Sequence, residues 1–203
     1  MQFKKNYHHG DLRQALIDTA IELIAERGMS DWSLREVARR IGVSHTAPYR
    51  HFADREALLA AVAEKGFQEM SNYLLQTLEK IPNEHSQRLQ SIGVAYVQYA
   101  IAHPCEYEVM FRYSQKDKRR YPALSEAATT AFMVLVNVIV EGQKAGAFRA
   151  ENPKGLAWVA WSLVHGLAML LVDGQLQVPE NSTVETLASF TTQMLTEGLQ
   201  ADR

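Results

Sequence analysis

The chain has 203 residues, of which 47% are hydrophobic and 22% charged, a composition typical of a soluble globular protein with one or two domains. Its net charge of −2 excludes a polycation that binds nucleic acid along its whole length. The best candidate for a membrane span, Ala157–Val172, ends at Asp173, so we expect no transmembrane segment. The single cysteine, Cys105, excludes internal disulfides and favours a cytoplasmic protein.

The charge is distributed unevenly along the chain. Residues 1–55 carry nine Lys/Arg and seven Asp/Glu, a net charge of +2, whereas residues 56–203 carry 12 and 16, a net charge of −4. A mildly basic N-terminal region on an acidic remainder is consistent with nucleic-acid contact through the N-terminal region.

Hydrophobic residues recur at helical spacing throughout, and no segment has the sustained alternation of a strand. Gly28, Gly42 and Pro104 mark helix ends. We therefore predict an all-α fold with about nine helices. They cover approximately residues 11–27, 33–41, 44–52, 54 to the break at Pro82, 87–102, 105–113, 122–146, 152–172 and 182–199.

Several helix starts have recognisable capping residues. Two Ser-x-x-Glu patterns, Ser33 with Glu36 and Ser182 with Glu185, predict capping boxes in which two backbone amides find side-chain acceptors. Asn152–Pro153 combines a favoured cap with proline at the first helical position. These patterns predict the starts of the second, eighth and ninth helices.

The segment Ser33–Phe52 has the pattern of a helix-turn-helix. Val37 and Ala38 are expected to face inward, and Gly42 can adopt the left-handed backbone of the turn. Ser44 is expected to cap the second helix. The outward positions of that helix are His45, Thr46, Tyr49 and Arg50. A helix that presents polar groups in this way can enter the major groove and read base edges.

Ser33–Leu58 resembles the DNA-binding motif of the tetracycline-repressor (TetR) family. That motif ends in Tyr-x-His/Tyr-Phe followed by Asp/Asn/Ser-Lys-Glu-x-x-Leu, and this chain has Tyr-Arg-His-Phe at residues 49–52 and Asp-Arg-Glu-Ala-Leu at residues 54–58. Two positions depart from the pattern. Pro48 stands where many members have Leu or Ile, and Arg55 replaces the usual lysine.

A second resemblance concerns the C-terminal part of the chain. The run of Trp161, three further residues, His165 and Gly166 resembles the Trp-x-x-x-His-Gly signature of one class of TetR C-terminal domain. The family resemblance implies a helix-turn-helix domain at residues 1–55 and a ligand-sensing and dimerisation domain at residues 56–203.

For DNA, the resemblance implies a set of contacting residues in and around the motif. They are Arg35, Ser44, His45, Thr46, Ala47, Tyr49, His51 and Arg55. We expect His45 and Thr46 to read base edges. We expect Tyr49, His51 and Arg55 to contact phosphates, which set register and supply affinity.

Three of these residues have an alternative, structural interpretation. Arg35 is equally well explained as part of a solvated helix face. Ser44 serves as a helix cap whatever else it does. His51 is the third, because its imidazole can be packed in the core of the motif.

Eight residues in the C-terminal part are candidates for a ligand site. They are Tyr96, Tyr99, Met110, Phe111, Phe132, Trp161, His165 and Met169. Helical spacing of large apolar residues usually indicates plain core, but buried Tyr hydroxyls and an imidazole need hydrogen-bond partners. A ligand can be that partner. These helices have no Arg/Lys cluster suited to phosphate. The pattern therefore predicts that the ligand is a hydrophobic or aromatic small molecule.

The last two helices carry apolar residues beyond the needs of one core. They are Trp158, Leu163, Leu167, Leu170, Leu187, Phe190, Met194 and Leu195. Such stripes indicate association, and the family resemblance implies a homodimer through these helices. It also implies binding to a palindromic operator, repression, and release by the ligand.

Two other classes of function are weighed against this one. A DNA-binding architectural or cell-division protein would share the motif but lack a ligand. An enzyme is less consistent with the sequence, because it has no Gly-rich phosphate loop, no nucleophile elbow and no metal-ligand spacing. We therefore expect neither a cofactor nor a bound metal.

Overall fold

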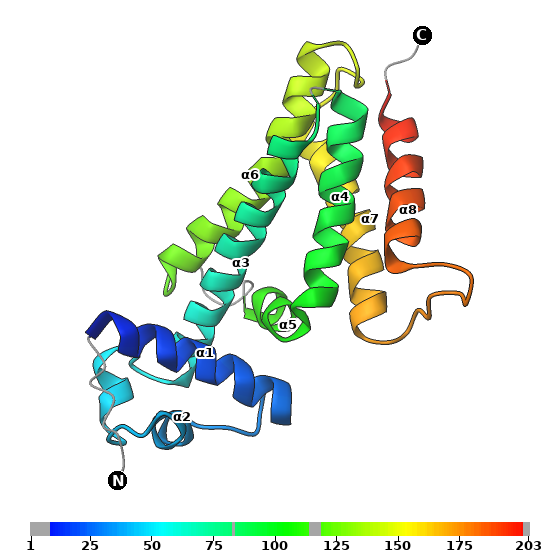
Figure 1. Ribbon diagram of the computed structural model, residues 1–203. Helices are drawn as coiled ribbons and strands as arrows, with labels where there is room; N and C mark the ends of the chain where they lie inside the picture. The colour runs from blue at the N-terminus through cyan, green and yellow to red at the C-terminus, as the bar shows by residue number, and fades with distance from the viewer. Residues whose placement is uncertain (1–8, 83, 114–118, 201–203) are drawn as a thin grey trace. The chain divides into compact units, whose positions relative to one another are not determined.

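The computed structural model describes residues 9–82, 84–113 and 119–200, and these residues form an all-α fold (Figure 1). The α-helices are α1 (His9–Arg27), α2 (Leu34–Ile41), α3 (Arg55–Lys80), α4 (His85–Ala102), α5 (Pro104–Tyr113), α6 (Pro122–Lys144), α7 (Pro153–Val172) and α8 (Val184–Leu199). A short 3-10 helix, η1, spans Ala47–Arg50. Within the described residues the extended structure is one isolated bridge between Phe148 and Gln200. The all-α prediction is confirmed.

The chain separates into two compact units. The head unit comprises residues 1–66 and 105–126, and the body unit comprises residues 67–104 and 127–203. Helices α3 and α6 contribute residues to both units. The functional boundary after residue 55 stays a prediction.

Helices α1 and α2 pack together in the head unit. Their buried residues include Leu16, Ile17, Ala20, Leu23, Leu34, Val37 and Ala38. Helix α1 ends at Gly28, which has φ +78°. The hydroxyl of Ser33 accepts a bond from Glu36 N (3.3 Å), as predicted. The reciprocal half of that capping box is not the contact observed, since the Glu36 carboxylate pairs with Arg27 (2.7 Å).

In the body unit, α4 packs against both α7 and α8 (Figure 1). The contact is close at Gly93, where an added Cβ would lie 2.4 Å from Thr192 Cγ2. Leu167 and Leu195 are each only 8% exposed. Their assignment to the dimerisation surface is therefore wrong, because both face the core of their own chain.

The starts of α7 and α8 test the capping predictions. Asn152 caps α7 by accepting bonds from Lys154 N (3.0 Å) and Gly155 N (3.3 Å), as predicted. The cap of α8 is Thr183, one residue later than the predicted Ser182. Its capping box joins Thr183 and Thr186, whose hydroxyl accepts from Thr183 N at 2.8 Å. The two threonine hydroxyls satisfy the amides of Thr183 and Thr186, so the predicted box between Ser182 and Glu185 is wrong.

Two helices, α6 and α7, are long and apolar enough to span a membrane by length and composition. The expectation of no transmembrane segment considered only unbroken apolar runs and stays a prediction. Core helices of globular domains share these properties. Helix α7 packs on α4 and α8 through buried residues such as Ala160 and Val164.

Candidate DNA-binding interface and effector site

The short helix predicted over residues 44–52 is the 3-10 helix η1, which spans only Ala47–Arg50. Ser44 does not cap it. Thr46 stands at the N-cap without a side-chain bond, and the two hydroxyls lie 3.1 Å apart. Pro48 accounts for the difference, because it has no amide to donate and its ring is buried. A helix is present where predicted, but the Ser44 cap and the predicted bounds are wrong.

Pro48 also anchors η1 to the motif. Its carbonyl accepts bonds from His51 N and Phe52 N, both at 2.9 Å. Phe52 is only 4% exposed, and the Arg13 guanidinium lies over its ring, 5.5 Å from the centroid. The proline ring thus fills an inward position of the motif.

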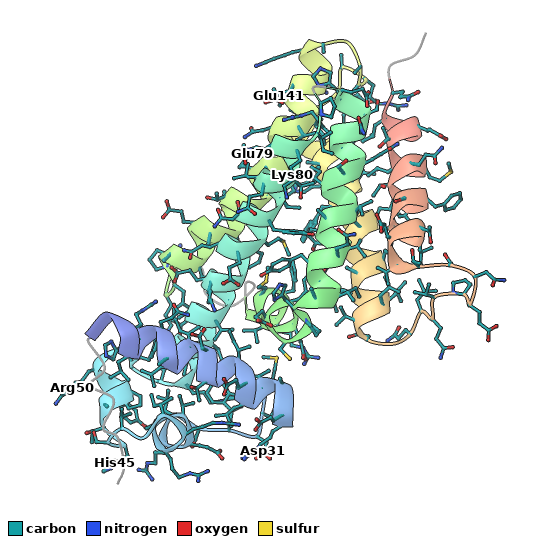
Figure 2. The ribbon with its side chains drawn as sticks, in the orientation of Figure 1. Asp31, His45, Arg50, Glu79, Lys80 and Glu141 are labelled. Carbon is teal, nitrogen blue, oxygen red and sulfur yellow. The ribbon has the colours of Figure 1, made fainter. Side chains whose placement is uncertain are left out.

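The residues on either side of Pro48 face solvent. Ser44, His45 and Thr46 are exposed, and Tyr49 is 51% exposed. Figure 2 shows His45 and Arg50 projecting outward from the head unit. Polar side chains therefore surround η1, as a DNA-reading element requires.

Three other predicted DNA contacts have different surroundings. Arg35 is exposed on α2, without an ion pair to any residue that the structure describes. Ala47 is half-buried. His51 is half-buried too, with its ring 6.5 Å from that of Phe52.

Arg55 differs from the other predicted contacts. Its guanidinium lies over the indole ring of Trp32, 4.3 Å from the ring centroid, and donates to the carbonyl of Met29. Its Nε is buried. Trp32 is 6% exposed. Sequence reasoning missed Trp32, although a large apolar residue directly before the helix cap Ser33 is a known packing signal.

Ion pairs cover the surface of α1 and α2. Arg40 pairs with Glu26, and this hydrogen bond is the main reason why the pKa of Glu26 is lowered. Arg39 pairs with Glu36 (3.4 Å). A cavity of about 260 Å³ between these pairs is lined by Leu23, Glu26, Arg27, Glu36, Arg39 and Arg40. The described residues contain no group of three or more His, Cys, Asp or Glu that could hold a metal ion.

In the body unit, three polar ring groups form a hydrogen-bonded cluster. Trp161 Nε1 donates to the Tyr96 hydroxyl (3.2 Å), which lies 2.9 Å from His165 Nδ1. If the hydroxyl accepts from Trp161, its own proton points to His165, whose Nδ1 is then an acceptor. Burial lowers the pKa of His165, which favours that neutral form. The partners of the buried polar groups are therefore each other.

Some of the eight candidate ligand residues lie together. Phe132 joins the cluster, with its ring 6.2 Å from that of Trp161, and Met169 lies one helical turn beyond His165, half-buried. Tyr99 packs against His103 instead (4.5 Å between centroids).

The remaining two candidates, Met110 and Phe111, belong to the head unit. Met110 is fully buried beside Gly66, where an added Cβ would lie 2.6 Å from its sulfur. Phe111 packs on Tyr107, with 4.7 Å between ring centroids. Each therefore has a local packing role within the head unit.

Comparison with protein families gives two matches. The family model for the tetracycline-repressor-like C-terminal domain matches residues 89–195, more than half of the chain. The model for bacterial regulatory proteins of the tetR family matches residues 16–62. The chain belongs to the TetR family. Membership in the Trp-His-Gly class of TetR proteins stays a prediction.

Individual curated regulators match part of the chain. BetI of Klebsiella pneumoniae is 36% identical over 81 residues, 39% of this chain and 42% of BetI. The class C tetracycline repressor of Escherichia coli is 46% identical over 52 residues, 26% of this chain and 24% of the repressor. The chain thus spans less than half the length of these curated relatives.

A solved structure matches along the whole chain. This protein of unknown function from Rhodococcus sp. RHA1 is 31% identical, with 98% of this chain and 100% of that one covered and a TM-score of 0.87. The fold shared with that protein therefore includes both the head and the body units.

The burial of His165 predicts a pH dependence of stability. Because burial lowers the pKa of His165, the unfolded chain binds a proton more readily than the folded one below the ordinary pKa of about 6.5. The free energy of unfolding should fall as the pH drops below about 6.5 towards the lowered pKa. His165→Asn keeps an acceptor but does not titrate, so its stability should fall less. Urea unfolding at several pH values measures this, and parallel pH curves would contradict it.

Proposed function

We propose that this TetR-family chain is a cytoplasmic, sequence-specific DNA-binding repressor rather than an enzyme. The observation that carries the proposal is the set of exposed polar side chains around η1. The left-handed turn at Gly42 leads into η1, and the buried ring of Pro48 holds η1 against the motif. Ser44, His45 and Thr46 are exposed there. Groove-facing side chains of this kind read bases, whereas phosphate contacts set register.

Base reading is assigned to His45 and Thr46, and phosphate contact to Tyr49 and the half-buried His51. Tyr49 supports this division because half of its surface is free and its hydroxyl can donate to a phosphate oxygen. Ser44, Ala47 and Arg35 complete the proposed contact surface.

We propose a homodimer through α7 and α8. Large apolar side chains on these helices are exposed: Trp158 (60%), Val159 (59%), Leu163 (41%), Leu170 (42%), Phe190 (60%) and Met194 (44%). Gly166 and Gly198 support the proposal, since a Cβ at either would meet nothing within 4 Å. Neither glycine is needed by its own chain, although glycine costs helix stability, so each favours close approach by a second copy.

Such a dimer would present two η1 elements to DNA. Two-fold symmetric readers of this kind bind half-sites one helical turn apart, about 34–36 Å. The proposed target is therefore a palindromic operator.

We propose that a hydrophobic or aromatic small molecule is the effector and that its binding releases the protein from the operator. Its site would lie at the aromatic cluster of the body unit. The support is that Phe132, Trp161 and His165 are only half-buried and so keep surface that an apolar ligand can cover. A ligand acts here only through its different affinities for two conformations.

One observation favours the second candidate, an architectural DNA-binding protein without an effector. Tyr96, Trp161 and His165 form hydrogen bonds with one another, so no ligand is needed to satisfy them. Both candidates share the DNA interface and differ only in the response to small molecules.

Thr46→Ala tests the DNA interface. We expect selection from random duplexes to give a palindromic operator for the wild type, and the variant to bind it more weakly by about 1–3 kcal/mol while random DNA is bound equally. Thr130→Ala, an exposed threonine of α6, is the matched control. Fluorescence anisotropy gives both affinities, and equal losses on operator and random DNA would refute the base-reading role.

Phe190→Glu tests the dimer. A carboxylate in the centre of an apolar interface is costly to desolvate, so the variant should sediment as a monomer at micromolar concentration while the wild type sediments as a dimer. Leu75→Glu is the control, because Leu75 is an exposed apolar residue of α3 (45%) outside the proposed interface. A wild-type monomer would overturn the proposal.

Phe132→Ala tests the effector site. Hydrophobic aromatic compounds should release the wild-type protein from its operator, and the variant should need at least about tenfold more compound, as for one lost aromatic contact. Leu75→Ala should behave as the wild type. If no compound releases an otherwise active DNA-binding protein, the architectural alternative is favoured.

A further inference from the structure

The contact between Arg55 and Trp32 closes the helix-turn-helix on itself. Trp32 directly precedes Ser33, the cap of α2, and Arg55 is the first residue of α3. All of α2, the Gly42 turn and η1 lie between these two residues in sequence. A contact that joins the two ends of a segment restricts the conformations of everything within it.

Both partners are built into the head unit. The indole ring is 6% exposed, and the guanidinium lies 4.3 Å from its centroid. The same guanidinium donates to the carbonyl of Met29, in the turn that begins at Gly28 with φ +78°. Arg55 therefore fastens the α1–α2 turn to the start of α3.

The other charged groups at the start of α3 are also engaged within the head unit. Asp54 Oδ1 accepts a bond from Ala57 N (2.8 Å) and so caps α3. Arg120 pairs with Asp54 and with Glu56 (3.1 Å). The first turn of α3 is thus fastened on both sides, with Arg55 directed to the aromatic ring.

We infer that Arg55 is a positioning residue for DNA binding and not a phosphate contact. It acts through Trp32 by holding the ends of the helix-turn-helix together, so that η1 is presented in one orientation. A planar guanidinium stacks on an aromatic face in a way that an ammonium group cannot match. This inference rests on the proposed DNA-binding function and concerns only how Arg55 serves it.

The salt dependence of binding separates the two roles of Arg55. A phosphate contact releases counterions, so its loss lowers the slope of log K against log salt by about one. We expect Arg55→Met to leave this slope unchanged and to reduce the ratio of operator to random-DNA affinity by about three- to tenfold. Arg35→Met, a matched arginine substitution at an exposed proposed contact, should lower the slope.

A double-mutant cycle tests whether Arg55 acts through Trp32. Trp32→Leu should cause a similar loss of operator preference, and the double variant should lose no more than either single variant. Trp32→Phe keeps an aromatic face and should recover part of the preference. A merely structural defect would lower the melting temperature without changing the operator-to-random ratio of the folded protein.

The experiments distinguish failure of this inference about Arg55 from failure of the proposed DNA-binding function. If the wild type selects no duplex sequence, the proposed function fails. If the wild type binds its operator but Arg55→Met lowers the slope by about one, leaves the ratio unchanged, or is additive with Trp32→Leu, the inference is overturned. Should Arg55→Met not fold, Arg55→Lys decides. It keeps the charge, so full operator preference in that variant would overturn the inference, and a reduced preference would support it.

Discussion

The left-handed turn at Gly42 is the constraint on which the N-terminal motif depends. Its φ of +75° is rarely available to a residue with a side chain. The turn ends α2 and lets Val43 N donate to the carbonyl of Ala38 (3.0 Å). It also brings η1 against α2 with Pro48 buried. The side chains around η1 are exposed because the Gly42 turn and the buried Pro48 fix the position of η1.

In the body unit, close helix packing depends on a glycine without a turn and on hydrogen bonds between side chains. The absence of a side chain at Gly93 lets α4 approach Thr192 of α8. Thr192 is 1% exposed, and its hydroxyl donates to the carbonyl of Ala188 (2.9 Å). Tyr96 and His165 satisfy each other across two helices. Because a buried polar group without a partner is costly, the Tyr96–His165 pair favours one fit of α4 on α7, whereas the Thr192 hydroxyl is satisfied within α8.

Helix α7 is apolar on more than one side. Val164 is buried against its own chain, whereas Trp158 and Leu163 face solvent. Such a helix can pack against a second partner as well as against its own chain. Covering its exposed apolar surface is favourable because that surface is removed from water. The same property makes α7 resemble a membrane-spanning helix in composition.

Local features were predictable from the sequence because their causes lie within a few residues. The all-α class, the ends of α1 and α2 at glycines and the Asn152 cap of α7 each depend on backbone groups within one helical turn. The motif at residues 33–58 identified the family because its spacing is local as well.

Tertiary structure decided the features whose partners are distant in sequence. Pro48 has no amide to donate, which disfavours a regular α-helix in this segment, and the motif takes up its ring as a buried side chain. Arg55 turns to Trp32, at the opposite end of the helix-turn-helix, and Tyr96 bonds to His165 across 69 residues. A residue pattern specifies which groups need partners, but only packing determines which partner is near enough to satisfy them.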